Sequence, residues 1–158
     1  MLAASDVMQS PRHDTAVTNG LERFLATLGA AACLVITIAI WRSVSSYQSM
    51  WPLPALYLIE MPAVSILAAW MVARNGQTTA LFAWAAVGIL FAFSIIGAWS
   101  VGFFYLPVAI IFTVVSVAFD ARTRQPVAAH LGAFFLAAIA QAAIMFAVIR
   151  LLSSSAVF

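Results

Sequence analysis

The sequence has little charge and no lysine. Of its 158 residues, 8% are charged and 65% are apolar, whereas a soluble domain has about 25% charged residues. The seven basic residues are all arginine, and five acids leave a net charge of +2. So few charges cannot cover a water-facing surface or neutralise a nucleic-acid backbone. The composition therefore predicts an integral membrane protein that does not bind nucleic acid.

Residues that carry chemistry are also scarce. The single cysteine, Cys33, lies in an apolar run, which excludes an internal disulfide, a redox pair and a thiolate metal cluster. His130 is the one histidine in an apolar segment, so a second histidine ligand for a haem is missing. The sequence has no glycine-rich phosphate loop or Gly-x-Ser-x-Gly elbow, and the acids are expected at other depths than His130. We therefore expect no enzyme activity, no metal and no cofactor, and we interpret His130 as an interfacial residue.

Long apolar segments dominate what is present. A bilayer core of about 30 Å needs roughly 20 helical residues. The uncharged run from Ala80 to Phe119 is twice that long, so it must contain two spans, with a turn near Gly97 and Gly102. The expected fold is an all-α integral membrane bundle of five transmembrane helices, at about 24–41, 53–73, 80–97, 103–119 and 126–152.

The remaining segments are short. Residues 1–20 are mixed polar and lack the pattern of a secretory signal, so they are expected to form a disordered cytoplasmic tail. Residues 21–152 are then the transmembrane domain, and 153–158 a short external tail. In a four-span alternative, the third and fourth segments form a re-entrant pair.

The arginines are distributed unevenly between the two sides. With the N-terminus inside, Arg42 and Arg150 lie outside, and the other five lie inside: Arg12, Arg23, Arg74, Arg122 and Arg124. Because short cytoplasmic loops carry an excess of basic residues, this count favours an N-in, C-out orientation. Tyr105 is then expected near the outer headgroup layer and Trp84 near the inner one.

Glu60 is the only acid expected within a span. Such acids generally face the bundle interior and often mark a proton or ion route. Ser94 and Gln141 are expected at a similar depth on other helices, and Glu60 could reach Arg42 at the outer end of the first span, so the four side chains could form a polar cluster. The cluster has two interpretations: a contact that ties helices together, or a proton or cation site.

Small residues suggest surfaces where helices meet. They gather at 29–33 in the first span and at 137–143 in the fifth, and such faces let helix backbones approach closely. We predict a non-catalytic accessory or structural subunit whose partners are the lipid bilayer and other membrane subunits or a second copy. The alternative is a small proton- or cation-coupled transporter or channel-like protein that uses Glu60. A lipid-modifying enzyme is the least favoured class.

The hairpin between the third and fourth spans carries one resemblance. Its matched residues are Ser100, Gly102, Phe104, Tyr105, Leu106 and Pro107. This stretch resembles a Ser-Ile/Val-Gly-x-Phe-Tyr-Leu-Pro signature of small, uncharacterised bacterial membrane proteins with four or five spans. The resemblance implies a bacterial inner-membrane protein with an outer hairpin here, and it implies no activity.

Overall fold

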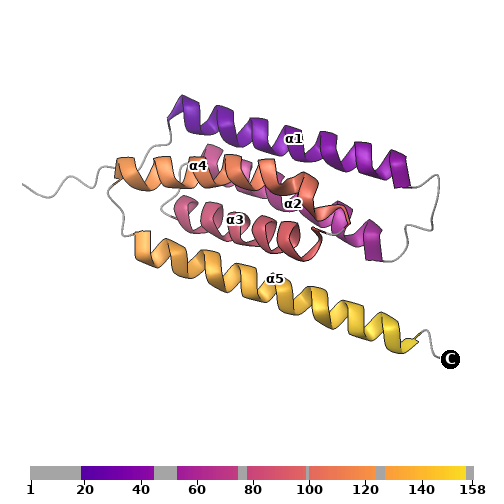
Figure 1. Cartoon of the computed structure of the whole chain (residues 1–158). Helices are drawn as coiled ribbons and strands as arrows, with labels where there is room; N and C mark the ends of the chain where they lie inside the picture. Colours follow the sequence, from indigo (N-terminus) through magenta and orange to yellow (C-terminus); the bar gives the residue numbers. More distant parts are fainter. Residues whose placement is uncertain (1–18, 45–52, 75–77, 99, 124–126, 156–158) are drawn as a thin grey trace, which may run out of the picture.

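The computed structural model describes residues 19–44, 53–74, 78–98, 100–123 and 127–155, and these residues are helical apart from short turns (Figure 1). The helices are α1 (Gly20–Val44), α2 (Leu53–Arg74), α3 (Thr79–Ile96), the short 3-10 helix η1 (Gly102–Tyr105), α4 (Leu106–Thr123) and α5 (Val127–Ser155). Five of them are long and apolar enough to cross a membrane. This confirms the all-α, five-helix part of the prediction. Most of the two predicted tails, residues 1–18 and 156–158, lies outside the described residues.

Successive long helices run in opposite directions, so the end of each helix lies at the same end of the bundle as the start of the next (Figure 1). At one end, which we call the N-terminal end, the start of α1 meets the end of α4 through Glu22 and Arg122. At the same end, Thr79 at the start of α3 donates a hydrogen bond to the carbonyl oxygen of Met71 near the end of α2. The turn between α3 and η1 lies at the other end, which we call the hairpin end (Figure 1).

Helix α3 lies at the centre of this arrangement. It contacts α2, α4 and α5, whereas α1 and α5 lie on opposite sides of the bundle (Figure 1). In the apolar part of α3, 61% of the residues are buried, against 11% in α5. Helix α5 is therefore a peripheral helix that packs mainly against α3.

A glycine permits the close approach of α5 to α3. A Cβ at Gly88 would lie 2.3 Å from the carbonyl oxygen of Phe134, closer than any real Cβ contact. The rings of Trp84 and Phe91, one turn to either side of Gly88, both make edge contacts with the ring of Phe134. The two helix backbones can meet at this point only because residue 88 has no side chain.

The predicted turn between the third and fourth spans is confirmed. The amide of Gly102 donates a hydrogen bond to the carbonyl oxygen of Gly97 at 2.8 Å. A Cβ at Gly102 would lie 2.6 Å from the carbonyl oxygen of Phe93, so the reversal leaves no room for a side chain there. The chain then enters α4 through η1.

Tyr105 does not face outward as the sequence suggested. It is fully buried, its hydroxyl lies 2.8 Å from Thr37 Oγ1, and its ring meets that of Phe93 edge to face. A tyrosine at the end of a span can anchor in the lipid headgroups or form a hydrogen bond with another helix. Tyr105 forms the hydrogen bond, because the turn after Gly102 directs its side chain toward α1. Tyr105 therefore ties the hairpin to α1.

Candidate functional site

Glu60 and Gln141 meet between the two helices that flank α3. Glu60 is half-buried on α2, and its carboxylate lies beside the side chain of Gln141 on α5 and near Tyr57 on its own helix. Gln141 is only 3% exposed, yet its Nε2 makes no hydrogen bond within the described part of the chain. The amide therefore approaches the carboxylate without closing a hydrogen bond.

The other two residues of the expected cluster lie elsewhere. Ser94 is buried in α3, and its Oγ has no hydrogen-bond partner among the described residues, so it bonds neither Glu60 nor Gln141. Arg42 is exposed in the last turn of α1, and the contacts shown for Glu60 are with Tyr57 and Gln141. Of the four residues, the structure brings together Glu60 and Gln141.

The Glu60–Gln141 pair lies at one end of an apolar groove. The groove consists of two adjoining recesses of about 380 and 230 Å³ that share Phe82 and Ala85 of α3 as their floor. One wall is formed by Val64, Leu67 and Ala68 of α2 and the other by Ala133, Ala137 and Ala140 of α5. We call this surface the α3 groove.

Helical spacing places the polar pair on the two walls. Glu60 precedes Val64 by one turn on α2, and Gln141 follows Ala137 by one turn on α5. Side chains four residues apart share a helix face. Glu60 and Gln141 therefore lie one turn beyond the lining of the α3 groove, toward the hairpin end of the bundle.

A second polar contact, which sequence reasoning missed, lies near the N-terminal end. The indole Nε1 of Trp84 donates a hydrogen bond to Asp120 Oδ2 at 2.8 Å, and His130 Nδ1 lies 2.8 Å from Asp120 Oδ1. The three residues come from α3, α4 and α5 and are 6%, 2% and 5% exposed. Each carboxylate oxygen of Asp120 thus faces a nitrogen from a different helix.

This contact overturns one expectation. His130 does not lie at a different depth from Asp120, and the two side chains are both buried. The physical reason is the short connection between α4 and α5, since a three-residue link places the last turn of one helix beside the first turn of the next. The spacing of ten residues between Asp120 and His130 was the signal that could have revealed the pair.

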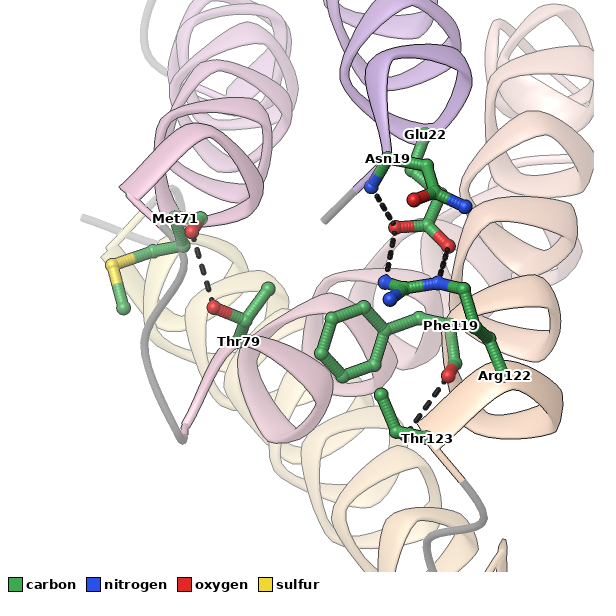
Figure 2. A network of polar contacts seen from close by, with 7 residues as sticks. All are labelled: Asn19, Glu22, Met71, Thr79, Phe119, Arg122 and Thr123. Atoms are coloured by element: carbon green, nitrogen blue, oxygen red, sulfur yellow. Dashed lines mark hydrogen bonds and ion pairs between the residues drawn. The ribbon is translucent and has the colours of Figure 1, made fainter. Parts of the chain in front are cut away.

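A third polar contact closes the N-terminal end between α1 and α4 (Figure 2). Arg122 donates from Nε to Glu22 Oε1 at 3.0 Å and from Nη2 to Glu22 Oε2 at 2.9 Å. The backbone amide of Asn19 also donates to Glu22 Oε2 at 2.9 Å, which is half of a capping box at the start of α1. The carboxylate therefore both caps α1 and binds α4, which is a structural role.

Comparisons with known proteins add no name to this geometry. No family model, curated protein or solved structure matches the chain. The class that the fold defines is a bundle of five helices able to cross a membrane.

Proposed function

We propose that the chain is a non-catalytic accessory subunit of a membrane protein assembly, and that it binds a transmembrane helix of its partner in the α3 groove. In this proposal the N-terminal end faces the cytoplasm of a bacterium and the bundle crosses the inner membrane. The arginine distribution supports this orientation, since Arg23, Arg74 and Arg122 lie at the N-terminal end.

The α3 groove is the observation that carries the proposal. Its α5 wall presents Ala133, Ala137 and Ala140 at helical spacing, and its floor exposes 47% of the Phe82 side chain. Between helices in lipid there is little hydrophobic driving force, so association depends on close packing over small residues. A concave face whose α5 wall carries three alanines together with Leu136 offers such packing to one further helix.

Photo-crosslinking in native membranes tests this function. A photoreactive residue at Ala137 or Phe82 should give one discrete adduct, and Ala137→Trp, which fills the groove, should remove the adduct formed from position 82. Ala31, exposed on α1 at the far side of the bundle, is the control position. Equal adducts from residues 31 and 137, or an adduct that persists in Ala137→Trp, would contradict the proposal.

A second candidate function is favoured by the polar pair itself. Glu60 is a half-buried carboxylic acid inside an apolar helix, and such acids often mark a proton or ion route. Under this candidate, several copies would assemble to form the pathway. Flux into proteoliposomes should then fall in Glu60→Gln, and equal flux in parent and variant would eliminate Glu60 as the carrier.

A further inference from the structure

The Glu60 side chain has no cation beside it in the part of the chain that the structure describes. Its contacts are Tyr57 and Gln141, which are both neutral. An ionised carboxylate beside an apolar groove is costly unless it is paired. The site is therefore incomplete in the isolated chain.

We propose that the partner helix in the α3 groove carries a lysine or arginine at the depth of Glu60, and that this side chain completes an ion pair with the Glu60 carboxylate. The inference rests on the proposed function and adds the chemistry of the partner. An ammonium or guanidinium group would give the carboxylate its counter-charge through charge-assisted hydrogen bonds.

Gln141 does not supply the missing counter-charge. It is 3% exposed, it lies beside Glu60, and its Nε2 has no hydrogen-bond partner in the described ranges. The amide is neutral and Nε2 is a hydrogen-bond donor, so Gln141 neither neutralises the Glu60 carboxylate nor binds a basic side chain through Nε2. A basic side chain that enters between the two walls would meet the Glu60 carboxylate.

A second copy of this chain does not supply the cation at the required depth. The described arginines lie near helix ends, whereas Glu60 lies seven residues inside α2, about 10 Å along the helix. The nearest cations toward the hairpin end are those of Arg42 and Arg150, and Arg150 follows Gln141 by nine residues, about 13 Å along α5. His130 already faces Asp120. We therefore take a different polypeptide as the partner, and a second copy is one of the outcomes of the test.

Model helices in phosphatidylcholine vesicles test the inference with the full chain. Three acceptor-labelled leucine–alanine peptides would carry a lysine at the depth of Glu60, a lysine one turn deeper, or no lysine, and energy transfer from the donor-labelled protein would report binding. The matched lysine peptide should bind about tenfold tighter than the peptide without lysine. This preference should disappear in Glu60→Gln and persist in Glu60→Asp, which keeps the charge. Equal binding of all three peptides by the parent, or an unchanged preference in Glu60→Gln, would overturn the inference.

Groove filling separates the inference from the function on which it rests. Suppose that Ala137→Trp abolishes binding of every peptide but the parent shows no preference for lysine. The proposed ion pair is then wrong, whereas the proposal that the α3 groove binds a helix is supported. If Ala137→Trp leaves binding unchanged while Ala31→Trp also has no effect, the proposed function fails. If donor- and acceptor-labelled copies of the protein bind each other and this association prevents peptide binding, the occupant of the groove is a second copy and the inference is overturned. Far-ultraviolet circular dichroism of each variant confirms that the helices remain formed.

Discussion

His130 Nδ1 lies 2.8 Å from Asp120 Oδ1 and joins α5 to α4. Gln141, which lies beside Glu60 of α2, is eleven residues further along α5, a distance of about 16 Å. Helix α5, the most exposed of the five, is thus joined to the bundle by packing on α3 and by one polar contact to each of α4 and α2. Because lipid gives apolar helices little reason to associate, these contacts specify where α5 docks.

Removing the carboxylate of Asp120 should loosen α5. Asp120→Ala leaves Trp84 Nε1 buried without an acceptor and removes the carboxylate beside His130 Nδ1, and we expect the free energy of unfolding to fall by about 1–3 kcal/mol. Ser116→Ala is the matched control, because that buried hydroxyl donates only to the carbonyl oxygen of Phe112 in its own helix. Unfolding in a denaturing detergent titration measures both variants. Equal losses in the two variants would remove the special role of Asp120.

The Trp84–Asp120 hydrogen bond can be isolated with a double-mutant cycle. Trp84→Phe keeps an aromatic ring against Phe134 but removes the indole N–H. Hydrogen bonds between membrane helices contribute about 0.6 kcal/mol on average, and we expect a coupling of at least that size because both partners are buried. The unfolding free energies of Trp84→Phe, of Asp120→Ala and of the double variant, each compared with the parent, give this coupling. Strict additivity would contradict the contact.

The fold was more predictable from sequence than the site. Apolar runs of known length predict helices, and the glycines at 97 and 102 predict the turn, because both signals are local. Glu60 and Gln141 stand out as polar residues in apolar helices, and their depths follow from counting residues. The direction of each side chain around its helix axis does not follow from that count, since it depends on which helices become neighbours. For this reason Ser94, at a similar depth, bonds neither residue.

Gly88 should be intolerant of any side chain. A Cβ there would lie 2.3 Å from Phe134 O, a backbone atom that can yield only if α5 moves. We expect Gly88→Ala to destabilise the bundle by about 1–3 kcal/mol through overpacking, although alanine is the better helix former. Gly132→Ala on α5 is the control, because nothing lies within 4 Å of its Cβ position. Detergent unfolding should show a loss for the first variant and none for the second, and tolerance of both would contradict the close contact.

The proposed orientation predicts where a reporter fused after Phe158 will lie. Five crossings from a cytoplasmic N-terminus put that residue outside, so alkaline phosphatase fused there should be active and green fluorescent protein should be dark. A second fusion after Arg74, at the end of α2, should give the opposite result. Fluorescence after Phe158 would contradict the proposed N-in, C-out arrangement of five crossings.

Exchanging the charges of Glu22 and Arg122 separates the two roles of the Glu22 carboxylate. Glu22→Arg alone places two cations together and removes the acceptor for the Asn19 amide, so it should be the most destabilising change. Adding Arg122→Glu restores the ion pair, which contributes about 1 kcal/mol, but an arginine at residue 22 still cannot accept the Asn19 amide. We therefore expect partial recovery of the unfolding free energy, and the remaining deficit measures the cap. Full recovery would mean that the cap contributes nothing, and no recovery would mean that the ion pair does not stabilise the bundle.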